Sequence, residues 1–442
     1  MPDNSYSTAD YSDRAIWAIA LPMMLSAIST PLVGLVDTAV MGHLDSPVFL
    51  AAVAANATIF SIILMGLNFL RMGTTGIAAQ HFGADDYDGV RVALGQAMIT
   101  AVLIALVFMA FQLPIGRIAL SLLGPDPVVR EYALEYFQIR IWSAPATLAS
   151  YALIGWFIGL QNARVPLIMV LITNVINIVL DLWFVVVLDW KVEGVAAASV
   201  IAEYIGVAVG LGFAFSQLRK HGGHWILAKL TTISEYRAFL AVNGHLFIRT
   251  IALMFTFAFI TAQGARQGGL ILAANAILIN LQHLLSFALD GLAHAAEALV
   301  GKAVGARSRA ALEASVSITL RWSLIIAVGF CAAFYVGGPL LIRMLTDLPE
   351  VRETTLTYLP WLVVSPLVSV LPFLYDGVFV GATRAKDMRD IMVISTVIVF
   401  LPAWYALQFL GNHGLWLSFI IFMASRSVGM HLFYRRRLLP GL

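Results

Sequence analysis

The sequence predicts an all-α membrane protein with twelve transmembrane helices, arranged as two six-helix parallel-repeat lobes. Three observations support this. Of the 442 residues, 60% are hydrophobic and only 12% are charged, which is about half the charged share of a soluble domain. Apolar runs long enough to cross a bilayer, about 20 residues each, recur along the chain. The second half also repeats the first at a fixed offset. This composition excludes a water-soluble enzyme, a disordered chain and a nucleic-acid binder.

Apolar runs between polar breaks define the expected spans. The first residues are polar and acidic, without the basic start of a cleavable targeting signal, so we expect the first run to be retained as a span. The polar stretches are too short to hold a soluble domain. The twelve expected spans cover residues 15–41, 48–80, 91–115, 131–160, 166–189, 194–217, 237–264, 269–301, 313–343, 353–381, 390–410 and 413–434.

The basic residues indicate the orientation. With the N-terminus in the cytoplasm, sixteen of the 27 Lys and Arg residues fall in cytoplasmic segments and six in outer segments. Such a bias favours both termini in the cytoplasm. Arg435, Arg436 and Arg437 fit an orientation anchor. We therefore expect a multi-pass protein of the bacterial cytoplasmic (inner) membrane.

When the sequence is shifted by 222 positions, identical residues recur along the chain without any gap in the alignment. Gly83-Ala84 aligns with Gly305-Ala306, and Gly155 and Gly159 align with Gly377 and Gly381. Arg130 and Tyr136 likewise align with Arg352 and Tyr358. Six spans per half is an even number, so both halves enter the membrane from the same side. The expected organisation is an N-terminal lobe (1–216), a cytoplasmic loop (217–236) and a C-terminal lobe (237–442), a plan common among secondary transporters.

Two acids lie deep in the first half. Asp37 lies about 34 Å along the first span from Arg14, and Asp181 lies about 25 Å along the fifth span from Arg164, at 1.5 Å per residue. Both depths fall in the outer half of the membrane. Ionisable groups in a bilayer are costly, so each is a functional candidate.

Polar side chains accompany these acids. Asn174, Asn177 and Asp181 are spaced i, i+3 and i+7 and share one helix face, and Ser199 lies near the outer end of the sixth span. Two neighbouring carboxylates do not both ionise cheaply, so one would hold a proton near neutral pH. The oxygens of this cluster also suit Na⁺, with Asp37, Asn177 and Asp181 as its ligands. The sequence does not choose between the two ions.

The second half does not copy this cluster. At the same offset, Asp37 aligns with Phe259, Asn177 with Val399 and Asp181 with Ala403, which suggests a division of labour. Some charges of the second half are secondary candidates, together with Glu203 in the sixth span. We expect Arg249 and Asp290 to be able to pair, and Glu297 and Asp376 to reach towards the cytoplasm.

Other chemistry is not indicated. The sequence has no zinc-protease, phosphate-loop or nucleophile-elbow motif, and its nine histidines show no paired ligand spacing. We expect neither enzymatic activity nor a cofactor. Pro22 and Pro31 interrupt the backbone hydrogen bonds of the first span and allow a kink on the helix that carries Asp37.

Several of these motifs together resemble the multidrug and toxic compound extrusion (MATE) family. They are residues 69–76 (FLRMGTTG), residues 177–181 (NIVLD), residues 194–199 (GVAAAS) and Pro22 fifteen residues before Asp37. Residues 376–384 (DGVFVGATR) resemble its DinF branch. The resemblance covers essentially the whole chain. It implies two six-helix lobes around a central cavity, a coupling site at Asp37, Asn177 and Asp181, and a bend of the first span at Pro22.

The preferred interpretation is an antiporter that exports organic, often cationic or amphiphilic, compounds in exchange for H⁺ or Na⁺. Its expected partners are small organic substrates and membrane lipid, without nucleic acid, and we expect a monomer. One alternative is a lipid-linked precursor flippase, which would favour a strongly cationic cavity. A major-facilitator transporter lacks support because the second loop has no Gly-x-x-x-Asp-Arg pattern. A passive channel and an intramembrane enzyme lack the residues that they need.

Overall fold

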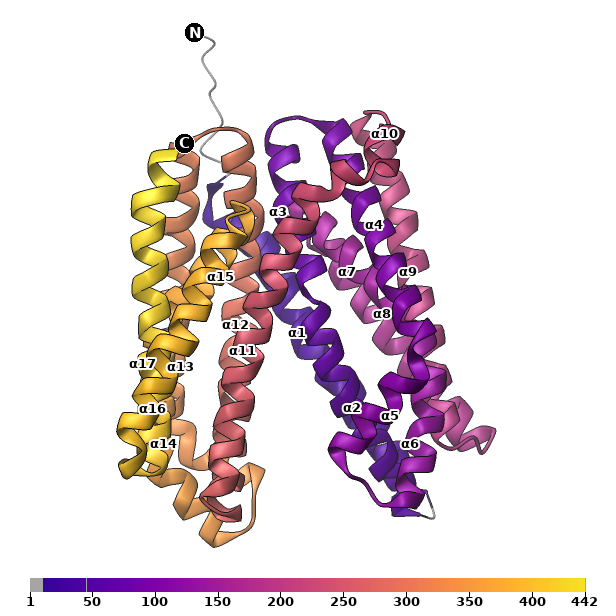
Figure 1. The fold of residues 1–442 in the computed structure, drawn as a ribbon, viewed down its shortest axis with the longest axis vertical. Helices are drawn as coiled ribbons and strands as arrows, with labels where there is room; N and C mark the ends of the chain where they lie inside the picture. Colours follow the sequence, from indigo (N-terminus) through magenta and orange to yellow (C-terminus); the bar gives the residue numbers. More distant parts are fainter. Residues whose placement is uncertain (1–10, 45, 442) are drawn as a thin grey trace. The chain divides into compact units, whose positions relative to one another are not determined.

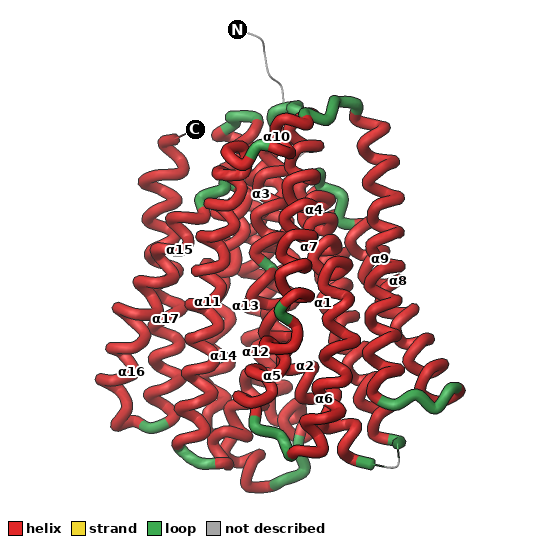
Figure 2. Tube along the Cα trace, turned by 45° about the vertical axis from the view of Figure 1, so that its right-hand side comes forward, coloured by secondary structure: helices red, strands yellow, loops and turns green. Residues whose placement is uncertain are grey.

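Long apolar helices make up the computed structural model, which describes residues 11–44 and 46–441 and shows no strand within them (Figure 2). Among the described residues, twelve helical spans are long and apolar enough to cross a membrane. The predicted spans are therefore confirmed. Three of the spans each join two helices: Pro47–Gly83, Pro127–Gly159 and Ala385–Leu410.

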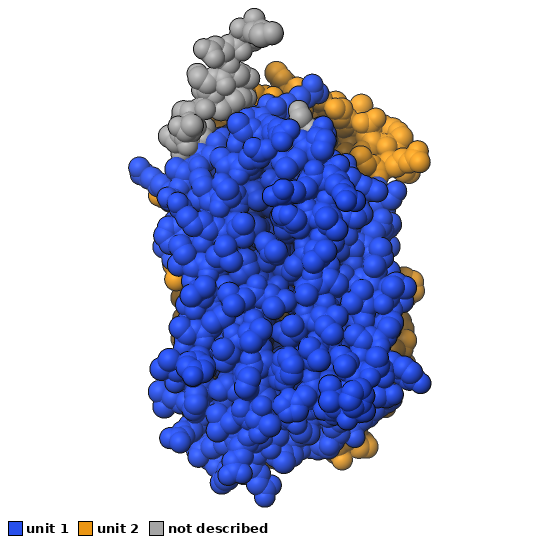
Figure 3. Space-filling view, turned by 90° about the vertical axis from the view of Figure 1, so that its left-hand side faces the viewer, with its two compact units in different colours: residues 1–21, 241–442 blue, residues 22–240 orange. Residues whose placement is uncertain are grey.

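The chain divides into two compact units. Unit 1 holds residues 1–21 and 241–442, and unit 2 holds residues 22–240 (blue and orange in Figure 3). The first helix, α1 (Asp13–Gly42), is continuous in secondary structure, but its residues up to Leu21 group with unit 1 and those from Pro22 with unit 2. The lobe boundaries drawn from the sequence stay a prediction.

The remaining helices of unit 2 follow in chain order (Figure 1). Within it α3 packs against α7, and α8 against α9. A π-helical turn, Leu182–Val187, extends α8 beyond Asp181. The helices are α2 (Pro47–Leu67), α3 (Phe69–Gly83), α4 (Tyr87–Ala110), α5 (Gln112–Leu123), α6 (Pro127–Arg140), α7 (Ala144–Gly159), α8 (Arg164–Asp181), α9 (Val192–His221) and α10 (Leu227–Thr231).

Unit 1 is built from the later helices. Within it α14 packs against α12, α13 and α17. A π-helical turn, Ser395–Phe400, joins α15 to α16 within one span. The helices are α11 (Arg237–Arg266), α12 (Gly269–Gly305), α13 (Arg309–Leu345), α14 (Pro349–Gly381), α15 (Ala385–Ile394), α16 (Leu401–Leu407) and α17 (Asn412–Phe433).

The third span ends earlier than expected. The sequence extended it to residue 115, but α4 ends at Ala110 and a separate helix, α5, follows. Gly124 adopts a left-handed conformation (φ 63°) and ends α5, as glycine commonly does after a helix. With twelve residues, α5 is too short to cross a bilayer. The length of its apolar run therefore does not predict a separate span.

Aligned glycines bring equivalent helices together in the two units. A Cβ atom at Gly155 would lie 2.3 Å from the backbone oxygen of Arg71, and one at Gly377 would lie 2.3 Å from that of Ala293. Arg71 and Ala293 are themselves 222 residues apart. Close backbone approach at small residues is typical of membrane helices. The contact confirms that the sequence repeat is also a structural repeat.

Large apolar side chains also lie on the outside of the helices. Leu122 is 83% exposed, Val336 80% and Phe409 78%. Extensive exposed apolar surface on a soluble protein would mark an interaction site. Around spanning helices, the same surface suits the hydrocarbon core of a bilayer.

Candidate functional site

Three helices of unit 2 carry the polar cluster that the sequence singled out. α1 carries Asp37, α8 carries Asn177 and Asp181, and α9 carries Ser199. α8 and α9 pack against each other. The face of α8 that carries Asn177 and Asp181, four residues apart, therefore meets α9. Asn177 donates a hydrogen bond from Nδ2 to Ser199 Oγ at 3.2 Å. The structure thus brings Asn177 and Ser199 together.

Asp37 and Asp181 form a carboxyl pair. Asp181 is fully buried, and its carboxyl group lies within hydrogen-bonding reach of Asp37. Within the described residues, no N–H or O–H group donates to either oxygen of Asp181 or to Oδ1 of Asp37. A hydrogen bond between two carboxyl groups needs a proton on one of them, because carboxylates have none to donate.

Asn177 adds another oxygen of this kind. Its Oδ1 atom is buried and accepts no hydrogen bond within the described part of the chain. Buried polar atoms are normally hydrogen-bonded, so each exception calls for an explanation such as an ion. Four buried oxygens, from Asp37, Asn177 and Asp181, therefore lack donors in one small region. Such an all-oxygen set fits a proton or a hard cation.

Asn174 has a different partner. Its Nδ2 atom donates to Ser29 Oγ of α1 at 3.0 Å. Asn174 therefore ties α8 to α1 one turn away from Asn177. This contact makes it a positioning residue for the helix that carries Asp37.

The sequence analysis missed two neighbours of the cluster, both on α6. Tyr136 is 5% exposed, and its hydroxyl lies beside Ser199 and near the carboxyl pair. Arg140, one turn later, exerts an electrostatic influence on both Asp37 and Asp181. The sequence does contain a signal for both residues. Tyr136 aligns with Tyr358 in the repeat, and Arg140, four residues later, shares the helix face of Tyr136.

Arg140 is itself held in place. Its Nη2 atom lies 3.4 Å from Oε1 of Glu203 on α9, and its guanidinium also contacts Ser143. The ring of Phe60 lies 5.4 Å from its Cζ atom. Glu203, a secondary candidate from the sequence, therefore positions a cation that acts on the carboxyl pair.

The acids of unit 1 are arranged differently. Asp376 on α14 contacts Arg249 on α11 and Arg426 on α17, with Oδ2 at 2.9 Å from Nη2 of Arg426. Arg426, 3% exposed, was not a candidate from the sequence. Two buried guanidiniums hold Asp376 inside the unit, and its expected position towards the cytoplasm stays a prediction. A pairing of Arg249 with Asp290 of α12 stays a prediction.

Glu297 is also buried rather than extended towards water. It is 3% exposed, and its Oε2 atom lies 3.4 Å from Nδ1 of His294 on the same helix. Its expected position towards the cytoplasm likewise stays a prediction.

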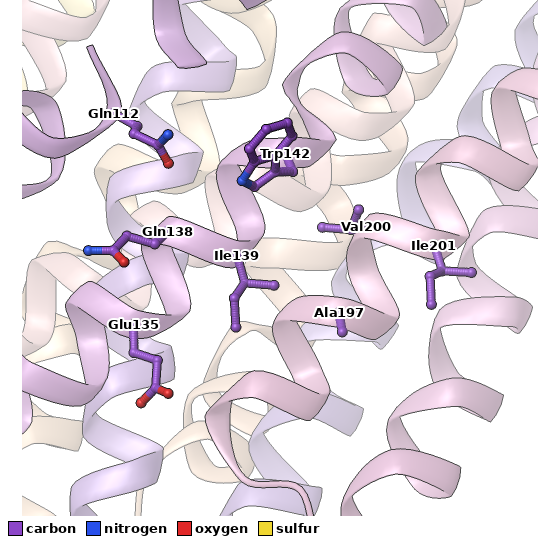
Figure 4. A pocket seen from close by; sticks show the side chains of 8 residues that line it. All are labelled: Gln112, Glu135, Gln138, Ile139, Trp142, Ala197, Val200 and Ile201. Carbon is purple, nitrogen blue, oxygen red and sulfur yellow. The ribbon is translucent and has the colours of Figure 1, made fainter. Parts of the chain in front are cut away.

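A cavity of about 570 Å³ lies beside α5, α6 and α9 in unit 2. Figure 4 shows Gln112, Gln138 and Glu135 on one side, with Val200 and Ile201 on the other. Trp142 is the aromatic residue among its described lining residues. Its volume lies within the range of about 300–1,000 Å³ that is typical of small-molecule sites.

Twelve spanning helices in two repeated halves, with a donor-free carboxyl pair in one half, define a class of protein. This class is the multi-pass membrane transporters built from internal repeats, in which intramembrane acids serve ion pathways.

Comparison with known proteins identifies the family. The MatE family model matches residues 22–183 and 246–405, one segment in each half. The chain is 40% identical to DNA damage-inducible protein F of Escherichia coli (strain K12), over 96% of this chain and 92% of that protein. It is 24% identical to multidrug and toxin extrusion protein 1 of Oryctolagus cuniculus, over 94% of this chain and 73% of that protein.

A solved structure described as the outward-facing conformation of a multidrug resistance MATE family transporter shares the fold. Its TM-score is 0.87 at 20% identity, with 97% of this chain and 96% of that chain covered. The chain belongs to the MatE family of multidrug and toxin efflux transporters.

Proposed function

We propose that this protein is a secondary antiporter that exports organic compounds in exchange for H⁺ or Na⁺. Four buried oxygens on Asp37, Asn177 and Asp181, which receive no donor from the described residues, support this proposal. Two facing carboxyl groups without an internal donor are stabilised by a cation between them, because a like-charge pair in a low-dielectric site is costly. A proton would bridge the two carboxyl groups. Na⁺ would be held by the same oxygens.

Ion binding would act on α1. A bound cation draws Asp37 towards Asp181, which ties the outer part of α1 to α8. Pro22 has no N–H group, so one backbone bond of α1 is missing at the residue where the helix passes from one unit to the other. The first part of α1 is attached to unit 1, where Asp13 contacts Arg321 and Trp322 of α13. Bending at Pro22 would couple ion occupancy to alternating access between the units.

The available driving force is sufficient for export. One proton that falls through 100 mV supplies about 2.3 kcal/mol. An electrogenic exchange could then sustain about fiftyfold accumulation of a neutral substrate, since 1.4 kcal/mol corresponds to a factor of ten. No cofactor or further partner subunit is needed for this exchange.

The charge distribution supports an inner-membrane location with both termini in the cytoplasm. Sixteen of the 27 basic residues lie in the segments that this orientation places inside. The names of relatives, among them multidrug and toxin extrusion protein 1, support organic compounds as substrates.

The flippase alternative has weaker support. It requires free cationic groups for a pyrophosphate, but Arg140 pairs with Glu203. Arg249 and Arg426 share Asp376. Antiport of organic compounds therefore remains the preferred function.

A gradient exchange tests the proposal. The purified protein would be reconstituted into vesicles, and transport of ethidium, a fluorescent organic cation, measured under an imposed pH gradient or an imposed Na⁺ gradient. We expect one gradient to drive transport and the other to have no effect, which identifies the ion. Transport that is indifferent to both gradients contradicts antiport.

A further inference from the structure

A second cavity, of about 620 Å³, lies in unit 1 between α11 and the span that contains α16. Its volume again fits a drug-sized ligand. Phe259, Trp404 and Tyr405 supply aromatic surface, and Arg266, Gln263 and Gln408 supply polar groups. Neither the proposed ion coupling nor the Asp376 cluster uses these residues.

The position of this cavity follows from the repeat. Phe259 occupies the place that Asp37 holds in the first half, and Ala403 occupies the place of Asp181. Phe259, Pro402 and Trp404 are among the residues that line the cavity. Ala403 lies between the last two in the chain. Unit 1 therefore has an aromatic cavity where unit 2 has its carboxyl pair.

The aromatic walls are ordered by contacts with one another. The ring centroids of Phe259 and Trp404 lie 6.4 Å apart at an interplanar angle of 79°, and those of Phe259 and Phe400 lie 5.5 Å apart at 80°. Edge-to-face packing fixes the rings and leaves ring surface for a further planar group. This arrangement suits a planar aromatic body.

The charge in the cavity is positive. Arg266, exposed in the last turn of α11, is the one charged group among the described lining residues, and Gln263 and Gln408 add neutral hydrogen-bonding groups. A guanidinium presents a planar fork that pairs with carboxylate or sulfonate oxygens. The cavity of unit 2 carries the opposite charge, from Glu135.

We propose that the cavity at Phe259 and Arg266 binds aromatic anions, organic molecules with a planar ring system and one carboxylate or sulfonate group, as exported substrates. The ring system lies against Phe259 and Trp404, and the acidic group contacts Arg266. This proposal rests on the proposed export function for its role, but binding itself requires no ion gradient.

Equilibrium binding to the purified full-length protein in phosphatidylcholine nanodiscs tests the proposal. The probes are 2-naphthalenesulfonate, neutral 2-naphthalenemethanol and cationic 2-naphthyltrimethylammonium, which share one ring system. We expect the anion to bind about fivefold more tightly than the neutral probe, since an exposed charge contact contributes up to about 1 kcal/mol. The cation should bind more weakly than both.

Two variants locate the binding. R266Q should remove the preference for the anion, whereas Arg343→Gln, at an exposed arginine at the end of α13, should leave it unchanged. Phe259→Leu keeps apolar bulk but removes the ring, and should weaken all three probes about fivefold. Phe409→Leu, at a ring that is 78% exposed outside the cavity, is its control.

Three results would overturn the proposal: an anion preference that survives R266Q, tighter binding of the cation, or loss of anion binding when phosphatidylglycerol replaces phosphatidylcholine. The last result would assign the cavity to the net-anionic lipid headgroup. The assay is made without a gradient, so a failure here leaves the antiport test untouched. Failure of the gradient exchange likewise leaves the binding result intact.

Discussion

The two units share their packing but differ in how they treat buried acids. Gly155 and Gly377 make equivalent backbone contacts, 2.3 Å from an ideal Cβ to an oxygen. In unit 2, Asp37 and Asp181 face each other with oxygens that receive no donor in the described residues. In unit 1, Asp376 lies between two guanidiniums. The repeat thus preserves the scaffold, while the buried acids differ. One unit has a carboxyl pair without a donor among the described residues, and the other has an acid paired with two guanidiniums.

The largest expected effect separates the two kinds of acid. Asp376→Asn leaves Arg249 and Arg426 buried without their carboxylate, and should lower the free energy of unfolding by about 3–5 kcal/mol. Asp37→Asn removes one of two facing carboxyl groups and should change it by less than about 1 kcal/mol. Thermal unfolding of the purified variants in detergent measures both. Equal destabilisation by the two substitutions would contradict the comparison.

The shared scaffold should respond equally in both units. Gly155→Ala and Gly377→Ala each force a Cβ against a backbone oxygen, and each should cost about 1–3 kcal/mol. Gly212→Ala and Gly329→Ala, where a Cβ meets nothing within 4 Å, are matched controls. The same unfolding assay applies. A large effect in one unit and none in the other would show that the packing is not equivalent.

A smaller effect should fall on the site of unit 2. Ser199→Ala removes the acceptor for the Asn177 amide, a hydrogen bond worth about 1 kcal/mol. We expect the ion concentration for half-maximal transport to rise about fivefold, while Ser199→Thr keeps the wild-type value. Unit 1 has Ile421 at the equivalent position. Ser317→Ala, on α13 of unit 1, serves as the control, and an unchanged ion dependence in Ser199→Ala would remove Ser199 from the site.

The smallest expected difference in stability between the units concerns the side chains that cap α4 and α13 at equivalent positions. Asp86 Oδ1 accepts from the Gly89 N–H at the start of α4, at 2.8 Å, and Ser308 Oγ accepts from the Ala311 N–H at the start of α13, at 3.3 Å. Burial alone would raise the pKa of Asp86, but the Gly89 N–H and the His81 ring hold this pKa below its usual value. Both caps contribute about 1 kcal/mol or less.

The two caps should therefore differ in their response to acid. Because the folded-state pKa of Asp86 is lowered, its contribution is complete above the unfolded-state value of about 4 and disappears as the pH falls through the folded value. The hydroxyl of Ser308 does not titrate. Asp86→Ser should reduce the loss of stability below pH 4 in thermal unfolding, and an unchanged acid profile would contradict this assignment.

The sequence predicts those features that depend on local pattern. Long apolar runs fixed the twelve spans, and helical spacing placed Asn177 and Asp181 on one face. The sequence did not predict Arg426 and Tyr136 as site residues, because their significance comes from tertiary contacts with Asp376 and Ser199. The burial of Glu297 depends on tertiary packing in the same way, because side-chain length does not reveal which neighbours enclose it. The helix α5 was too short to register as a span.

We propose that the carboxyl pair of unit 2 couples the ion to export. Gradient-driven ethidium transport in vesicles, measured for Asp37→Asn and Asp181→Asn, tests it most directly. Asp189→Asn is the matched control, because Asp189 is exposed and its φ of 56° also suits asparagine. We predict that both site variants insert and bind ethidium but lose gradient-driven transport, while Asp189→Asn retains it. Full gradient-driven transport by either site variant would contradict ion coupling at this carboxyl pair.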